Sequence, residues 1–189
     1  MKFSRIIANS GEWLSGDGPN RQIVVSSRVR LARNLSKKPF PGWAKKAERL
    51  EVVKLVKDAV EHLPEMSESY SENLETLSSL EKQVLVERHL ISREHAAKGV
   101  GSAVVMNAPQ SLSVMINEED HLRMQAICCG LQLDKVYEMI NRVDSELEEV
   151  LDFAFDSRLG YLTACPSNVG TGMRASAMLH LPGLVMSDQ

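Results

Sequence analysis

The chain has 189 residues, of which 43% are hydrophobic and 25% are charged, as in an ordinary globular protein of one domain. Its net charge of -3 excludes a protein that holds polyanions by overall charge, so we expect no direct nucleic-acid binding and only local anion sites. The first residues lack the apolar run of a secretory signal, and no segment approaches the length of a membrane span, which indicates a cytoplasmic protein without membrane contact. Three cysteines, two of them adjacent, argue against a disulfide framework and against a zinc site; we expect no protein-held metal.

Two arginines follow the first predicted strand, which begins at Ile23 after a turn-rich segment. In an extended chain Arg28 and Arg30 share one face, while Val29 and Leu31 share the other. Paired guanidinium groups suit a bidentate phosphate site. They are also typical of a charged edge strand, so both interpretations stay open here.

Periodicity predicts the remaining elements. Apolar residues recur at helical spacing over residues 44–63, 74–90 and 133–155. Residues 101–106 and 111–116 are apolar runs joined by Asn-Ala-Pro-Gln, the signature of an antiparallel hairpin. Long helices with hairpin strands predict an α+β fold, a mainly antiparallel sheet flanked by helices.

Acidic residues follow the second hairpin strand. Asn117-Glu-Glu-Asp120 is followed by His121 and, two residues later, by Arg123. The ends of strands are places where scaffolds present catalytic groups. An acidic helix N-terminus is the alternative, because the helix dipole favours negative charge there.

A second candidate site lies in residues 160–178. We expect a short strand over residues 161–164, then Cys165, a turn through Gly170 and Gly172, and a helix from Met173 to about Leu181. The positive end of that helix would face the turn and favour both an anion and a Cys165 thiolate. A cysteine that is only a small buried hydrophobe is the competing interpretation.

Three motifs together resemble the ATP:guanido phosphotransferase family. They are Ser26-Ser-Arg-Val-Arg30, Asn117-Glu-Glu-Asp-His-Leu-Arg123 and Leu162-Thr-Ala-Cys-Pro-Ser-Asn-Val-Gly-Thr-Gly-Met-Arg-Ala-Ser176. The resemblance runs from about Trp13 to the end of the chain. It implies the fold of a phosphagen-kinase-like catalytic domain.

The resemblance also implies roles for individual residues. Glu119 would hold the acceptor guanidinium and help to remove its proton, and the Cys165 thiolate would orient the same group. ATP, with Mg²⁺ bridging its phosphates, would be bound by Ser26, Ser27, Arg28, Val29, Arg30, His89, Arg123, Arg174, Ala175, Ser176, Ala177 and Met178. Supporting roles fall to Ser167, Asn168, Gly170 and Gly172.

Within the family the chain is most similar to the bacterial subgroup that phosphorylates arginine residues of proteins. Only 25 residues precede Ser26, so we expect one domain over residues 1–189, with a lead-in over residues 1–20 and no separate N-terminal helical domain. The subgroup implies arginine-containing protein substrates marked for degradation or altered repressor activity, an activator protein, Clp-type protease machinery and a homodimer. Family members continue beyond Gln189 with a second carboxylate loop, so we expect an incomplete domain with weak or no activity. A kinase for a free guanidino metabolite and a non-catalytic nucleotide-binding homologue remain alternatives.

Overall fold

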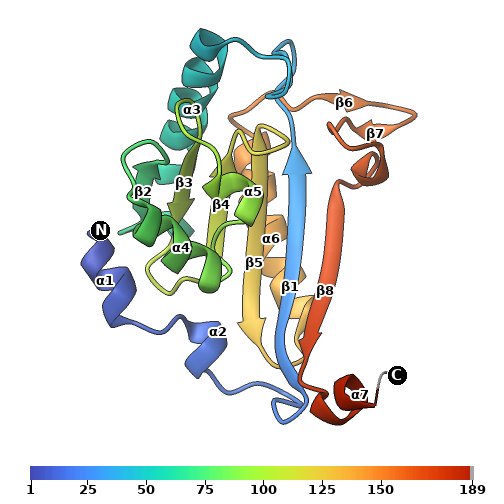
Figure 1. Cartoon of the computed structure of the whole chain (residues 1–189). Coiled ribbons are helices and arrows are strands. Elements are labelled where there is room, and N and C mark those ends of the chain that lie inside the picture. The colour runs from blue at the N-terminus through green and yellow to red at the C-terminus, as the bar shows by residue number, and fades with distance from the viewer. Residues whose placement is uncertain (188–189) are drawn as a thin grey trace.

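The computed structural model describes residues 1–187; Asp188 and Gln189, the end of the predicted domain, lie outside the described residues. One six-stranded sheet, in the order β2-β3-β4-β5-β1-β8, organises the molecule, and every pair of neighbouring strands is antiparallel (Figure 1). Its strands are β1 (Val24–Arg33), β2 (Tyr70–Asn73), β3 (Ala103–Met106), β4 (Leu112–Ile116), β5 (Leu122–Cys129) and β8 (Met173–Leu179). A separate small hairpin consists of β6 (Phe155–Asp156) and β7 (Gly160–Tyr161). The predicted α+β class with a mainly antiparallel sheet is confirmed.

Helices cover the two faces of the sheet unequally. The helices are α1 (Phe3–Ala8), α2 (Glu12–Ser15), α3 (Lys46–Glu61), α4 (Ser79–Glu87), α5 (Arg93–Ala96), α6 (Leu133–Glu148) and α7 (Pro182–Met186), with 3-10 turns η1 (Pro64–Met66) and η2 (Pro166–Asn168). The main core lies between the sheet and helices α3 and α6. A smaller core packs α1 and α4 against the opposite face of β2, β3 and β4. That opposite face therefore stays open over β5, β1 and β8 (Figure 1).

The lead-in over residues 1–20 is packed onto this scaffold. Ile6 of α1 is fully buried in the smaller core, and Trp13 of α2 is 4% exposed. Arg88 donates hydrogen bonds to the carbonyl oxygens of Ile6 and Asn9, which end helix α1. The lead-in is thus held by the segment that precedes His89, one of the predicted nucleotide-binding residues.

The predicted helix after residue 172 is wrong. Residues 173–179 form the edge strand β8, paired with β1 in a register that places Arg174 opposite Arg30. Met, Ala and Leu favour a helix locally, but pairing with the exposed edge of β1 overrides that preference. Among residues 1–187 no helix starts directly after the turn at Gly170 and Gly172, and Arg174 lies in a strand.

The acidic segment after β4 does not begin a helix either. It forms the turn between β4 and β5, with Asn117 at a φ of 57°. The sequence predicted no element for β5, which lies in the interior of the sheet. No helix in the described part of the chain is long and apolar enough to cross a membrane.

Candidate active site

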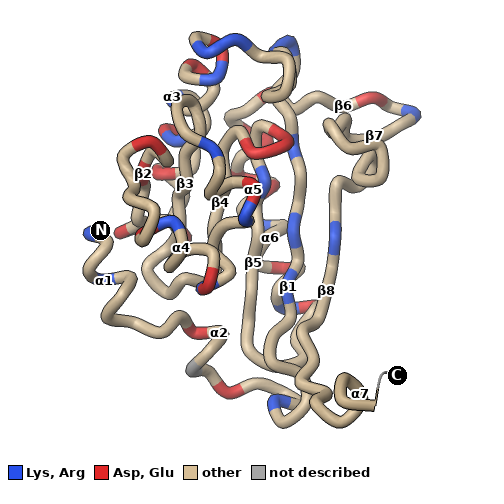
Figure 2. The backbone as a smooth tube through the Cα atoms, viewed as in Figure 1, with Lys and Arg blue, Asp and Glu red and all other residues tan. Residues whose placement is uncertain are grey.

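Four arginines gather on the open face of the sheet. Antiparallel register places Arg30 beside Arg174 on β8, and Arg28 beside Ser176. On the other side of β1, Arg123 of β5 lies opposite Ala32, so its side chain emerges on the same face. Figure 2 shows the basic residues of β1 and β8 side by side. Because β1 lies between two strands, the edge-strand interpretation of its arginines is wrong.

These guanidinium groups repel one another. Burial, followed by the charges of Arg28, Arg123 and Arg174, lowers the pKa of Arg30 to about 10. Burial and the charges of Arg123 and Arg174 also lower the pKa of Arg28. Among the described residues only Arg123 of the four has an ion-pair partner, and the Nε atom of Arg30 is buried without a hydrogen bond. The charge and donors of such a cluster suit a multiply charged anion.

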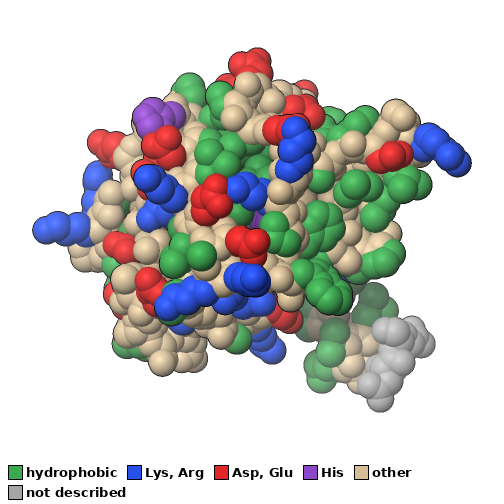
Figure 3. Space-filling view, turned by 90° about the horizontal axis from the view of Figure 1, so that it is seen from above, with side chains coloured by type: hydrophobic (Ala, Val, Ile, Leu, Met, Phe, Trp, Pro, Cys, Tyr) green, Lys and Arg blue, Asp and Glu red, His purple; other side chains and the backbone are tan. Residues whose placement is uncertain are grey.

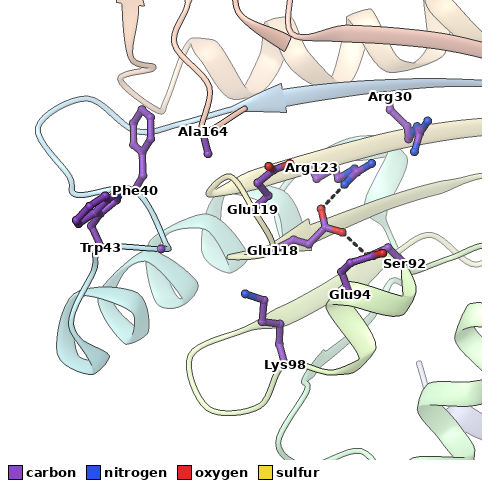
Figure 4. A pocket seen from close by; sticks show the side chains of 11 residues that line it. Arg30, Phe40, Trp43, Ser92, Glu94, Lys98, Glu118, Glu119, Arg123 and Ala164 are labelled. Carbon is purple, nitrogen blue, oxygen red and sulfur yellow. Dashed lines mark hydrogen bonds and ion pairs between the residues drawn. The ribbon is translucent and has the colours of Figure 1, made fainter. Parts of the chain in front are cut away.

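Glu118 fixes the orientation of Arg123. The Glu118 carboxylate is 2% exposed, accepts a hydrogen bond from Arg123 Nη1 at 2.6 Å and accepts another from the Ser92 hydroxyl. Figure 4 shows both contacts. The sequence predicted a role only for the neighbouring Glu119, which is exposed, and nothing in the pattern of three acids separates their roles.

Glu119 and Cys165 meet at one small cavity, which we call the Cys165 cavity. Its volume is about 160 Å³, and it is lined by Arg30, Leu31, Ala32, Glu119, Asp120, Arg123, Cys165, Ser167, Asn168, Gly172 and Arg174. The Cys165 sulfur lies 2.9 Å from the hydroxyl oxygen of Ser167, a residue to which the sequence assigned a supporting role. Segments more than 130 residues apart in the sequence therefore place two carboxylates, a thiol and three arginines around one space.

Asp120 ties the two halves of this cavity together. Its Oδ1 atom accepts hydrogen bonds from the backbone N–H of Ala164 and from the Asn34 side chain, both at 2.6 Å. The Asn34 side-chain oxygen in turn accepts from the backbone N–H of His121. The Asp120 carboxylate thus links the turn that carries Glu119 to Ala164, the residue before Cys165.

A buried ion pair anchors the loop that carries Cys165. Arg33 contacts Asp144 of α6 at 2.6 Å, and its guanidinium carbon lies 3.5 Å from the centre of the Tyr161 ring. Arg33 Nη1 also donates to the carbonyl oxygen of Thr171 at 2.9 Å. Gly172, at a φ of 62°, accepts a hydrogen bond from the Ala32 N–H. These contacts fix the loop where β8 begins.

A second cavity, the His89 cavity, extends the arginine row away from Glu119. It has a volume of about 230 Å³ and is lined by Ser26, Arg28, His89, Ile127, Ser176, Ala177 and Met178. The His89 ring packs edge-on against Trp13, with centroids 5.1 Å apart, and burial next to Arg28 lowers its pKa. Apolar side chains beside polar ones suit a nucleoside.

Four of the predicted nucleotide-binding residues face the other way by register. Ser27, Val29, Ala175 and Ala177 alternate with the arginines and point to the α6 side of the sheet, although Ala177 also borders the His89 cavity. Ser27 donates a hydrogen bond to the Gly130 carbonyl oxygen and accepts one from the Gln132 N–H. It stabilises the turn between β5 and α6.

The family profile described as ATP:guanido phosphotransferase, C-terminal catalytic domain, matches residues 51–189. The chain belongs to the ATP:guanido phosphotransferase family. It is 49% identical, over 95% of its own length and 51% of the relative, to the protein-arginine kinase of Halothermothrix orenii. It is 48% identical to the protein-arginine kinase of Pelotomaculum thermopropionicum, over 94% of the chain and 51% of that relative.

Solved structures agree with this membership. The chain is similar to the duplicated taurocyamine kinase from Schistosoma mansoni with bound transition state analog components, with a TM-score of 0.83 and 27% identity over 90% of this chain and 25% of that one. The chain spans about half the length of the curated guanido phosphotransferases it matches. The open face, the Cys165 cavity and the His89 cavity are therefore features of a guanido phosphotransferase domain.

Proposed function

We propose that this chain forms the nucleotide site and the acceptor carboxylate of a kinase that transfers the γ-phosphoryl group of ATP to arginine residues in proteins. The observation that carries the proposal is the Cys165 cavity, where Glu119 and Cys165 lie beside three arginines. The names of the similar proteins support the choice of a protein acceptor.

ATP fits along the arginine row. Its base and ribose would occupy the His89 cavity, where Ile127 and Met178 offer apolar contact. Its phosphates would then lie over Arg28, Arg30 and Arg174, the guanidinium groups without carboxylate partners among the described residues. In this orientation the terminal phosphate points to Glu119.

Magnesium would arrive with the nucleotide. Within residues 1–187 no cluster of three or more His, Cys, Asp or Glu side chains is arranged to hold a metal ion. When bound to the phosphates, Mg²⁺ would neutralise charge on the transferring group, as is usual in phosphoryl transfer. The arginines hold the remaining phosphate oxygens.

The residues of the Cys165 cavity account for the chemistry. A guanidinium is a poor nucleophile until it loses a proton, which the Glu119 carboxylate at the border of this cavity would accept. A bond forms between the guanidinium nitrogen and the γ-phosphorus while the bond from that phosphorus to the ADP oxygen breaks. The Cys165 thiolate would orient the guanidinium, and the Ser167 hydroxyl, whose oxygen lies 2.9 Å from the sulfur, would donate a hydrogen bond to that thiolate. Positioning and charge neutralisation supply most of the rate.

The resemblance adds partners to the proposal. Phosphoarginine would mark repressors or damaged proteins for Clp-type protease machinery in the cytoplasm, with an activator protein and a homodimer as further features of the subgroup.

The test uses radiolabelled ATP, Mg²⁺ and an arginine-rich protein. We expect weak acid-labile, base-stable label on arginine, which is lost in Glu119→Gln and Cys165→Ala variants that still bind ATP. Label on free arginine but not on protein would overturn the choice of acceptor. Tight ATP binding without transfer to either acceptor would indicate a nucleotide-binding homologue instead.

A further inference from the structure

The space beside Glu119 is larger than a guanidinium group requires. A cavity of about 760 Å³, which we call the Trp43 cavity, shares Arg30, Glu119 and Arg123 with the 160 Å³ Cys165 cavity. Ligand sites for molecules of drug size span roughly 300–1,000 Å³. An acceptor guanidinium in the smaller cavity therefore leaves the larger one for whatever is attached to it.

One wall of the Trp43 cavity is aromatic. Phe40 and Trp43 line it, and Trp43 is 88% exposed. The backbone N–H of Trp43 donates to the Phe40 carbonyl oxygen at 2.8 Å, which closes a turn. The Phe40 ring meets the His121 ring edge-on, and His121 Nε2 lies 3.0 Å from the Pro39 carbonyl oxygen. Because His121 follows Glu119 by two residues, the aromatic wall has a fixed position relative to that carboxylate.

The opposite wall carries charges of both signs. Glu94 in α5 and Lys98 just after it line the cavity, and both are exposed. Neither side chain has an ion-pair partner in the part of the chain that the structure describes. Figure 4 shows them across the cavity from Phe40 and Trp43, with Glu118 and Glu119 between the two walls. Seen from above, acidic, basic and apolar side chains are interspersed over this end of the molecule (Figure 3).

We propose that the Trp43 cavity binds the polypeptide segment that flanks the acceptor arginine, with Trp43 packed against a residue next to that arginine. The inference rests on the proposed function and names the substrate class of the same site. An exposed tryptophan on a fixed turn is the type of residue that contributes most to protein interfaces. A mixed-charge wall suits a main chain with varied side chains. Free arginine, filling the smaller cavity, would leave Trp43 uncovered.

Tryptophan fluorescence tests the inference directly. The chain has two tryptophans, and Trp13 is 4% exposed, so acrylamide quenches mainly Trp43. The probe is a fluorescently labelled ten-residue peptide with one central arginine. Its binding to the protein is followed to saturation by fluorescence anisotropy of the label, in the presence of a non-hydrolysable ATP analogue. We expect the saturated peptide to protect Trp43 from acrylamide at least twofold, and free L-arginine to give no protection.

Variants supply the second arm. Trp43→Ala should raise the Kd of the peptide about tenfold and leave the Kd of the ATP analogue unchanged. Val150→Ala, which truncates a 66% exposed side chain outside this cavity, is the matched control and should change neither. No peptide binding, no protection at saturation, or an equal effect of Trp43→Ala on peptide and free arginine would overturn the inference.

The two proposals fail in distinguishable ways. Absence of phosphoarginine on every acceptor, with protection of Trp43 intact, would refute the proposed function and leave the peptide site standing. Phosphorylation of the peptide without protection of Trp43 would support the proposed function and refute the peptide site at Trp43.

Discussion

Replacing Arg174 should make the nucleotide-free domain more stable and its nucleotide site weaker. Arg174 lies directly opposite Arg30 across the β1–β8 pair, and its charge lowers the pKa of both Arg28 and Arg30. Like charges in such cross-strand pairs cost about 0.2–1 kcal/mol. Arg174→Met keeps the length of the side chain and removes its charge. For a chain of this size we expect the Tm without nucleotide to rise by about 1–3 °C.

The same substitution removes a charged donor to the ATP phosphates. A hydrogen bond to a charged group contributes about 1.5–3 kcal/mol, so the Kd for ATP should increase about 10- to 150-fold. Thermal unfolding at low and high salt and calorimetric titration with ATP measure the two effects. The gain in Tm should shrink at high salt, because screening weakens the repulsion. Arg158→Met, at an exposed position between β6 and β7, is the control and should change neither quantity. A lower Tm would refute the repulsion between Arg174 and its neighbouring arginines. An ATP Kd within twofold of the original would refute the assignment of Arg174 to the ATP phosphates.

Three further predictions concern the scaffold of the site. Arg33→Met leaves Asp144 buried without its partner and should reduce the free energy of unfolding, measured in urea, by about 3–5 kcal/mol. The double variant with Asp144→Leu should recover part of this loss, and a double variant that loses the sum of the two single losses would contradict the pairing. Gly172→Ala places a Cβ atom on a residue with a φ of 62°, 2.5 Å from the Ala32 carbonyl oxygen, so the Tm should fall by several degrees. Gly183 has open space around it, so the Tm of Gly183→Ala should not change. Equal Tm changes in the two variants would speak against strain at Gly172. Burial lowers the pKa of His95 to about 4, so between about pH 6.5 and 4 the unfolded chain binds a proton at this residue and the folded chain does not. The free energy of unfolding should therefore fall by about 3 kcal/mol as the pH drops through that range. Urea titrations of His95→Gln should show a weaker dependence of this free energy on pH, and an unchanged dependence would exclude His95 as its source.

The sequence contained enough information to predict the sheet class and to name the residues that gather at the candidate site. Alternation placed Arg28 and Arg30 on one face of β1, and the hairpin of β3 and β4 formed where the apolar runs and turn residues predicted it. These features are local, so a pattern over a few residues determines them. The resemblance assigned Glu119 and Cys165 to one site, and both residues line the Cys165 cavity, while their catalytic roles stay predictions.

The sequence-based predictions were wrong or missing where contacts between residues far apart in the chain determine the structure. Residues 173–179 have helix-forming side chains, and only the free edge of β1 makes them a strand. Residues 122–129 pair on both sides in the interior of the sheet, yet Arg123 and Gln125 interrupt the apolar pattern because they face the open site. The Arg33–Asp144 pair joins residues 111 apart, and no local signal marks it. Polar side chains on the open face of the sheet thus hide the apolar pattern of β5.

The central claim is that ATP and the arginine acceptor occupy opposite ends of one continuous site that meets at Arg30 and Glu119. The most direct measurement is a pair of titrations, ATP analogue and arginine peptide, on Glu119→Gln and Arg174→Met side by side. We predict that Glu119→Gln weakens peptide binding at least tenfold with the ATP Kd unchanged, and that Arg174→Met does the opposite. If either variant weakens both ligands equally, or if Glu119→Gln leaves peptide binding intact, the account is contradicted.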